Sequence, residues 1–353
     1  MRKNTIRIGV AGALAAAAVL AMSGCSGTAS ADSSAAAGSG SKTVTIYSAD
    51  GLGDWYKKQF ADFTAKTGIA VQYVEAGSGE VVSRALKEKS NPQADVLVTL
   101  PPFIQQAKSK GLLQKTGADL SAIPAKEKDA GGDYVSLVEN YASMIRGTAA
   151  SPKPDAWSDL LASSYQGKIQ YSTPGQAGDG TAMLLLLEHT MGHKAALDYL
   201  GKLQKNNVGP SSSTGALGPK VSKGELVVAN SDLQMAEQSI AADKSAYEVF
   251  FPKGDDGKRA TVALPYAMGL AAGAPDKANG DKLISFLLSK EVQQTISGDA
   301  FGFPARSDVT PTDANYQTLK TALDGVELWQ PDWTSVLGSL DSTVSAYKSA
   351  TGQ

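Results

Sequence analysis

The sequence predicts an α/β protein built as two lobes. Its 353 residues exceed one ordinary domain, so two lobes or domains are expected. A hydrophobic content of 42% is enough for a sizeable core. Short apolar runs alternate with amphipathic stretches along the chain, which is typical of a mainly parallel sheet with helices on both faces.

Residues 1–24 have the pattern of a lipoprotein signal peptide. Three basic residues precede an almost uncharged run, 8–22, that is too short to span a bilayer comfortably. The small residues before Cys25 resemble a bacterial lipobox, although Met22 stands where leucine is commoner. We therefore expect Cys25 to be lipidated; the alternative is a plain secretory cleavage site followed by a free cysteine.

The segment 25–41 continues this N-terminal region as a flexible linker. After Cys25 it is built mainly of serine, glycine and alanine and has no apolar periodicity. We expect it to tether the folded body outside the cytoplasmic membrane. A single cysteine excludes a disulfide framework, and the net charge of −2 with scattered Lys and Arg excludes a nucleic-acid partner.

The first lobe is expected over 42–142, where strands and helices alternate. Its strands are predicted at 42–48, 69–73 and 94–98, and its helices at 54–66 and 77–89. The first helix carries Tyr56, Phe60 and Phe63 on one face and ends at Gly68.

The second lobe is expected over 143–262, and 263–353 returns to the first lobe and adds C-terminal helices. In this part we predict strands at 168–171, 227–229 and 248–251, and helices at 182–191 and 278–288. The apolar run 262–270 contains Pro265, which favours a crossing between lobes over a central strand. A helical tail is expected to contain Trp329 and Trp333.

The glycine-rich turn 172–181 follows a strand and opens an apolar helix. Such a turn presents free backbone N–H groups and the positive end of a helix dipole, which together bind anions. No lysine follows the glycines, so the turn is not a nucleotide-binding loop. The alternative is that Ser172 and Thr173 only shape the turn while Asp179 caps the helix.

Further polar residues follow other predicted strands, at the edge where ligands bind in such sheets. Asp50 ends the first strand, the turn at Ser78 and Gly79 opens a helix, and Asp232 and Gln234 follow a strand of the second lobe. Tyr266 lies in the crossing segment. These residues also have simpler interpretations: Asp50 as an ordinary turn residue, the turn at Ser78 and Gly79 as a helix cap, and Tyr266 as a buried core residue.

We predict no catalytic residue, metal site or cofactor. His189 and His193 lie four residues apart at a helix end, but no acidic base separates them and no third ligand is evident. No nucleophile elbow occurs. The turns instead offer donors for an anion and carboxylates for a cation, so a small zwitterion would satisfy both.

Seven long strings of the sequence are distinctive: YSADGL (47–52), QYVEAGSGEVVSR (72–84), NPQADVLVTLPPFIQ (91–105), QYSTPGQAGDGTA (170–182), YLGKLQKNNVGPSSSTG (199–215), VANSDLQM (228–235) and FPARSDVTP (303–311). They resemble the substrate-binding component of 2-aminoethylphosphonate ABC importers, a branch of the type II periplasmic binding proteins. Ferric-iron-binding relatives use paired tyrosines, and no Tyr-Tyr dipeptide occurs here.

The resemblance implies a two-lobed type II periplasmic-binding-protein fold with the ligand in the cleft between lobes. It also implies 2-aminoethylphosphonate as the ligand and an ABC permease with its ATPase subunits as partners. We expect a monomer that transports without catalysis. A sugar phosphate, polyamine or iron remains an alternative ligand, and a phosphonate- or phosphoester-cleaving enzyme a further alternative.

Combining this ligand with the turns gives a predicted site. The phosphonate is expected at the turn that opens the apolar helix, on Ser172, Thr173, Gly180 and Thr181. Ser48, Ser78 and Gly79 are expected to contribute from the first lobe. The ammonium is expected near Asp50 or Asp232, with Tyr266 and Gln234 completing the cage.

Overall fold

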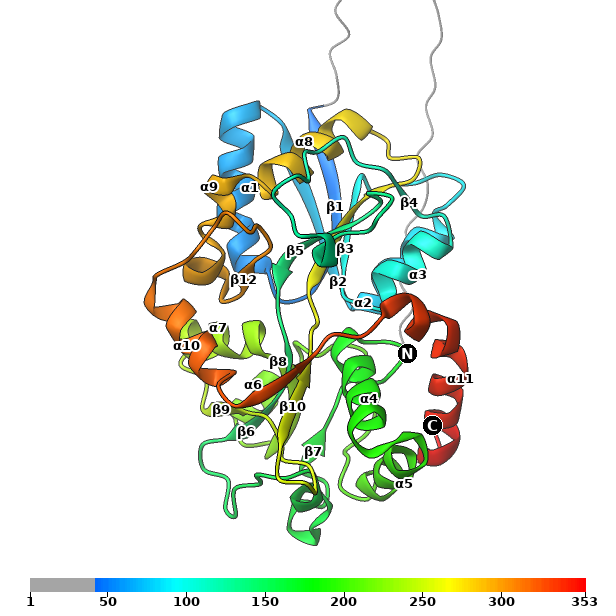
Figure 1. The fold of residues 1–353 in the computed structure, drawn as a ribbon, viewed down its shortest axis with the longest axis vertical. Coiled ribbons are helices and arrows are strands. Elements are labelled where there is room, and N and C mark those ends of the chain that lie inside the picture. Colours follow the sequence, from blue (N-terminus) through cyan, green and yellow to red (C-terminus); the bar gives the residue numbers. More distant parts are fainter. Residues whose placement is uncertain (1–41) are drawn as a thin grey trace, which may run out of the picture. The chain divides into compact units, whose positions relative to one another are not determined.

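Two β-sheets form the framework of the computed structural model, which describes residues 42–353 (Figure 1). The predicted signal peptide, Cys25 and linker lie outside these residues. The strands of the larger sheet are β1 (Thr43–Ala49), β2 (Ala70–Ala76), β3 (Val96–Thr99), β4 (Leu113–Gln114), β5 (Val135–Glu139), β11 (Tyr266–Ala271) and β12 (Phe303–Pro304). Their order is β12-β5-β11-β3-β1-β2, and β4 also pairs with β11.

The larger sheet is mixed, not mainly parallel. β1 is parallel to β2 and β3, whereas β11 is antiparallel to β3 and β5, and β12 is antiparallel to β5. The prediction that 262–270 crosses between lobes without forming a central strand is therefore wrong for Tyr266–Ala271. Pro265 directly precedes this strand, so its missing N–H removes no bond from the ladder, and every residue of β11 is buried.

The smaller sheet consists of β6 (Ala142–Gly147), β7 (Ile169–Gln170), β8 (Val228–Asp232) and β9 (Tyr247–Phe250). The order is β7-β8-β6-β9, with β7 parallel to β8 and the other pairs antiparallel. A separate parallel pair joins β10 (Arg259–Val262) and β13 (Val326–Trp329).

The predicted helical tail is wrong at Trp329, which ends β13. Pro331 follows two residues later, and a residue before proline is disfavoured in a helix. The helix begins only at Trp333, where the Asp332 carboxylate accepts hydrogen bonds from two backbone N–H groups of the first turn.

Helices surround the sheets, mostly where the alternating pattern predicts them. The α-helices are α1 (Gly53–Thr67), α2 (Ser78–Lys87), α3 (Phe103–Ser109), α4 (Gly178–Met191), α5 (His193–Leu203), α6 (Gly218–Ser222), α7 (Leu233–Asp243), α8 (Lys277–Leu287), α9 (Lys290–Gln293), α10 (Ala314–Ala322) and α11 (Trp333–Thr351). Single helical turns are η1 (Ala125–Glu127), η2 (Ser158–Leu161), η3 (Ser163–Tyr165) and the π-helix η4 (Ile296–Ala300). The helix predicted at 182–191 begins earlier, at Gly178, because the glycine-rich turn supplies its first residues.

The predicted apolar face of α1 fixes the β1–α1 turn against the core. Tyr56 and Phe63 are fully buried, and Phe60 is partly buried and stacks on Tyr56 with ring centroids 4.7 Å apart. Burying a side chain such as Phe63 contributes about 1.5–3 kcal/mol. Gly68 ends the helix at a φ of 72°, as predicted. The turn that carries Asp50 is therefore held by a well-packed helix.

The chain passes between the two sheets twice. β5 ends at Glu139 and β6 begins at Ala142, and β10 ends at Val262 before β11 returns to the larger sheet. The lobe boundaries expected at 142/143 and 262/263 remain a prediction. The C-terminal helix α11 packs against α5, and the Tyr347 hydroxyl donates a hydrogen bond to that of Tyr171 at 3.1 Å. Within residues 42–353 no helix is both long enough and apolar enough to cross a bilayer.

Candidate functional site

The turn after β7 and the first turn of α4 contain four of the predicted ligand residues: Ser172 and Thr173 in the turn, and Gly180 and Thr181 in the helix. Ser172 is fully buried, and its hydroxyl accepts hydrogen bonds from Asn230 Nδ2 at 3.0 Å and Thr214 Oγ1 at 2.9 Å. The Ser172 N–H donates to Asn230 Oδ1 at 2.8 Å. β8, which carries Asn230, therefore fixes the start of the turn.

The two threonine hydroxyls hold the turn in shape. Thr173 Oγ1 accepts from the Ser211 N–H at 3.0 Å. Thr181 Oγ1 donates to the Ala177 carbonyl at 2.8 Å and accepts from the Gly175 N–H at 2.9 Å. Both residues stand at the helix entrance as predicted, but their hydroxyls already have protein partners. Their role toward a ligand stays a prediction.

The α4 entrance leaves no room for side chains at its glycines. A Cβ at Gly180 would lie 1.9 Å from the Ser172 carbonyl oxygen. At Gly178 it would lie 2.7 Å from Leu100 Cδ1 and 2.9 Å from Ser78 Oγ. Backbone therefore approaches backbone at Gly180, which only glycine permits, whereas at Gly178 the close neighbours are side chains.

The predicted turn at Ser78 and Gly79 lies against the α4 entrance. The Gly79 N–H donates to the Gln176 carbonyl at 2.9 Å, which joins α2 to the turn before α4. Ser48 bonds within its own neighbourhood instead, since its hydroxyl donates to the Ala49 carbonyl at 2.9 Å and lies 3.3 Å from the Tyr56 hydroxyl.

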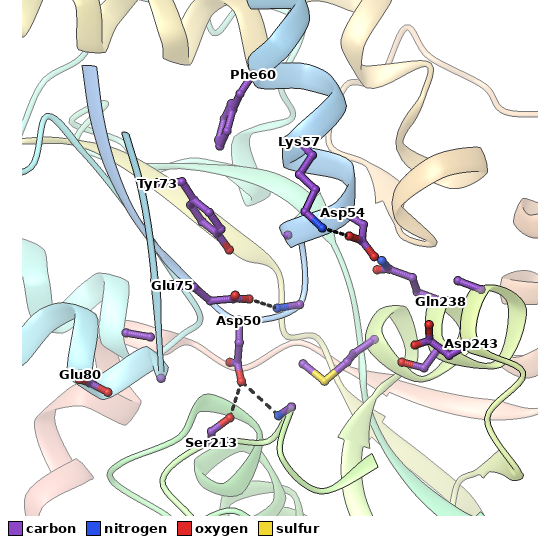
Figure 2. A pocket seen from close by; sticks show the side chains of 18 residues that line it. Asp50, Asp54, Lys57, Phe60, Tyr73, Glu75, Glu80, Ser213, Gln238 and Asp243 are labelled. Carbon is purple, nitrogen blue, oxygen red and sulfur yellow. Dashed lines mark hydrogen bonds and ion pairs between the residues drawn. The ribbon is translucent and has the colours of Figure 1, made fainter. Parts of the chain in front are cut away.

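Asp50 reaches across to residues 211–215, which we call the serine loop (Figure 2). Asp50 Oδ2 accepts from Ser213 Oγ at 2.6 Å and from the Gly215 N–H at 3.1 Å. No residue of this loop is among the predicted ligand residues. Its signal was visible as a run of three serines and a threonine inside one of the strings that carry the resemblance.

Tyr266, Asp232 and Gln234 meet beside Asp50. Tyr266 is fully buried, and its hydroxyl lies 2.9 Å from the Asp50 carbonyl, 3.2 Å from Gln234 Oε1 and 3.4 Å from Asp232 Oδ2. Asp232 also accepts from the Met235 N–H at 2.7 Å and so caps α7. The four residues predicted to hold the ammonium are therefore brought together; their contact with a ligand stays a prediction.

Burial shifts the ionisation of the acids in this region. It raises the pKa of Asp232 to about 6, with the hydrogen bond from the Met235 N–H opposing the shift. Burial and the charge of Asp232 also raise the pKa of Asp179 well above its ordinary value. Both carboxyls thus hold protons more tightly here than in water.

We expect the ligand-free protein to become less compact as the pH rises from about 4, the ordinary pKa of an aspartate, to about 6, the raised pKa of Asp232. A state in which carboxyl pKa values are raised is favoured at low pH and loses stability as pH rises through those values. Carboxyls with lowered pKa values, such as that of Asp155, titrate below about 4, whereas Glu139 and Glu237, whose pKa values burial also raises, add to the same trend. Small-angle X-ray scattering should show the radius of gyration increasing; an unchanged radius in this range would contradict the expectation.

A cavity of about 760 Å³ opens beside Asp50, between α1, the end of β2 and α7 (Figure 2). Its acidic lining consists of Asp50, Asp54, Glu75, Glu80 and Asp243. Among the described residues, Lys57 is the one basic residue that lines it, and it pairs with Asp54 at 2.6 Å. The cavity therefore favours cations at its mouth.

The two histidines lie at helix ends. His189, in the last turn of α4, stacks on Trp329 with ring centroids 4.1 Å apart. His193 begins α5 and its Nδ1 lies 2.7 Å from Glu188 Oε1. Across residues 42–353 no three or more His, Cys, Asp or Glu side chains are arranged to hold a metal ion.

Residues 91–333 match the family described as bacterial extracellular solute-binding protein. This chain belongs to that family. The solute-binding protein is also 50% identical over 315 residues to a periplasmic protein of Salmonella typhimurium, provisionally named as 2-aminoethylphosphonate-binding. The alignment covers 87% of this chain and 92% of the Salmonella protein. A spermidine/putrescine-binding periplasmic protein of Escherichia coli is 24% identical, over 81% of this chain and 85% of its own length.

Solved structures confirm the two-lobed periplasmic-binding-protein fold. The binding protein AfuA of Actinobacillus pleuropneumoniae, with fructose-6-phosphate bound, matches with a TM-score of 0.76 at 18% identity, over 88% of this chain and 99% of AfuA. The ferric binding protein of Campylobacter jejuni matches with a TM-score of 0.70 at 20% identity, over 87% and 99% of the two chains. These relatives of the solute-binding protein are binding proteins, not enzymes.

Proposed function

We propose that this solute-binding protein captures 2-aminoethylphosphonate and delivers it to an ABC permease. The observation that carries the proposal is the 50% identity to the Salmonella protein over most of both chains. The site supports it, because the entrance of a 14-residue helix lies in the same region as the buried carboxylate of Asp232 and the half-buried carboxylate of Asp50. A ligand with an acid at one end and an amine at the other would use both.

The phosphonate would bind at the entrance of α4. The first N–H groups of a helix lack partners within it, and the helix dipole favours an anion there. Thr214 and Ser172 already share a hydrogen bond of 2.9 Å, and both are buried. These hydroxyls would turn toward the phosphonate oxygens when it enters, because a charged acceptor forms the stronger hydrogen bond.

The ammonium would bind between Asp50 and Asp232, with Tyr266 and Gln234 beside it. Asp50 comes from the end of β1 and Asp232 from the end of β8, so one ligand would touch both sheets. Ligand contacts made from both sides favour the closed state, which the permease with its ATPase subunits would recognise. No bond is made or broken in this proposal.

We propose that the protein acts as a monomer outside the cytoplasmic membrane, held there by a lipid on Cys25. The family is extracellular by its description, which supports the compartment.

The experiment is a calorimetric titration across a panel of compounds. We expect one-to-one binding of 2-aminoethylphosphonate and binding weaker by at least about 100-fold for ethylphosphonate and ethanolamine, since each leaves buried polar groups unpaired. Heat with fructose-6-phosphate or putrescine but none with 2-aminoethylphosphonate would overturn the proposed ligand. Release of phosphate on incubation would favour the enzyme alternative.

A further inference from the structure

Asp179 is a buried acid whose side chain has an unused oxygen. It is only 3% exposed, and its Oδ1 has no hydrogen-bond partner among residues 42–353. The sequence alternative in which Asp179 caps α4 is wrong, because the N-cap position is Ala177 and no described side chain caps this helix. A buried acceptor without a partner costs about 1–3 kcal/mol, so its presence requires an explanation.

Two further carboxylates lie close enough to act on it. Asp232 and Asp50 are the charged groups whose fields raise the pKa of Asp179, and both are acidic. The groups that act on Asp232 itself are the Met235 N–H, Asn140, Asp50 and Tyr266, none of them a base. The pKa of Tyr266 is raised by burial and by the same three acids, Asp232, Asp179 and Asp50, with a further contribution from the Tyr56 hydroxyl. We call Asp50, Asp179 and Asp232 the acidic trio; in the described part of the chain no basic side chain pairs with it.

A small cavity adjoins Asp179 on the side of β6. Its volume is about 20 Å³, which is room for one water-sized group. Ser143 also lines it, is 6% exposed and has a hydroxyl without a partner in the described chain. In the β6–β8 ladder Ser143 faces Ser231, next to Asp232. The other walls are apolar and include Trp157 and Met183.

We propose that Asp179 is the principal acceptor of the ligand's ammonium group, with Ser143 as a second acceptor and Asp50 and Asp232 as the surrounding charges. An ammonium group is about the size of a water molecule and donates three hydrogen bonds. Asp179 Oδ1 and Ser143 Oγ are two unused acceptors beside a cavity of matching size. This inference rests on the proposed function and names the residue within its cation site.

Cation binding should release a proton. Burial and the charges of Asp232 and Asp50 raise the pKa of Asp179 and so favour its protonated form in the ligand-free protein. When a substituted ammonium enters, the carboxyl gives its proton to solvent and the carboxylate pairs with the ammonium, so the charge in the site stays balanced. Affinity for an amine-bearing ligand should then increase with pH, up to the pH at which the amine itself loses its proton.

The test compares the natural chain with Asp179→Asn, using 2-aminoethylphosphonate and ethylphosphonate as probes. Asparagine matches the shape of the protonated acid, so folding should be retained and checked by thermal unfolding. We expect Asp179→Asn to weaken 2-aminoethylphosphonate binding at least tenfold and to change ethylphosphonate binding less than about threefold. Calorimetry in Pipes and Tris buffers should show less proton release for the variant than for the natural chain, because only Asp232 can still give up a proton there.

Two further variants keep the test decisive. Ser143→Ala should weaken the binding of 2-aminoethylphosphonate by about threefold or more and leave that of ethylphosphonate unchanged. This variant tests the inference even if Asp179→Asn does not fold. Asp341→Asn, on the exposed face of α11, removes a charge far along the chain and should bind as the natural chain does. If the natural chain binds no 2-aminoethylphosphonate, the proposed function fails. If it binds and Asp179→Asn binds equally with unchanged proton release, the inference alone is overturned and the cavity holds only water.

Discussion

A Gly180→Ala chain unfolds more easily than the natural chain and no longer binds 2-aminoethylphosphonate. The added Cβ would lie 1.9 Å from the Ser172 carbonyl oxygen and 2.5 Å from its carbon. Both atoms are backbone, and the Ser172 N–H and hydroxyl are fixed by Asn230, so the strand end cannot give way alone. The α4 entrance must therefore move away from the β7 turn, and with it the N–H groups proposed to hold the phosphonate.

The loss of folding free energy expected from the clash exceeds the gain expected from alanine as the better helix former. Overpacking of this kind costs about 1–3 kcal/mol or more, whereas alanine in place of glycine inside a helix gains about 1 kcal/mol. Urea denaturation should show a lower midpoint, and calorimetry should show no binding heat.

Gly338→Ala is the matched control, because Gly338 lies within α11, is exposed and would have no described atom within 4 Å of an added Cβ. It should raise the free energy of unfolding by about 0.5–1 kcal/mol and leave binding intact. Equal stability and affinity of the natural and Gly180→Ala chains would show that the entrance of α4 is looser than the structure indicates.

The local elements of this fold could be predicted from the sequence because each carries its own signal. The face formed by Tyr56, Phe60 and Phe63 predicts α1, and Gly68 marks its end, since 3.6-residue periodicity and a left-handed stop depend on neighbouring residues alone. The direction and neighbours of a strand depend on distant segments. β11 was therefore not predicted. Pro265 suggested an interruption of the strand, whereas the pairing of β11 with β3 and β5 depends on distant segments of the larger sheet.

The site was predictable where a polar residue directly follows a strand. Ser172 follows β7 and Asp232 ends the parallel strand β8, so both lie at one edge of the smaller sheet, while Asp50 follows β1 of the larger sheet. The serine loop has no periodicity, so nothing local placed Ser213 against Asp50 at 2.6 Å. Asp179 looked like a helix cap because acids are common in a first turn. Its unused oxygen is visible only when the packing around it is known.

Asp232→Asn should weaken binding of 2-aminoethylphosphonate by roughly 10- to 150-fold, which corresponds to about 1.5–3 kcal/mol for a hydrogen bond to a charged group. Asp232 is fully buried, so its interaction with an ammonium would be little screened by solvent. Asparagine caps a helix as well as aspartate does, so the bond from the Met235 N–H and the fold should both survive.

Asp50→Asn separates the two candidate acids. Asp50 binds Ser213 and Gly215 through Oδ2, so its replacement would loosen the serine loop as well as remove charge. A charge effect should weaken 2-aminoethylphosphonate far more than ethylphosphonate, whereas a loosened loop should weaken both alike. Measuring both ligands against both variants therefore isolates the interaction with the amine. If neither variant changes the preference for the amine-bearing ligand, the ammonium does not bind between these two acids, and the charge-matched site proposed here is wrong.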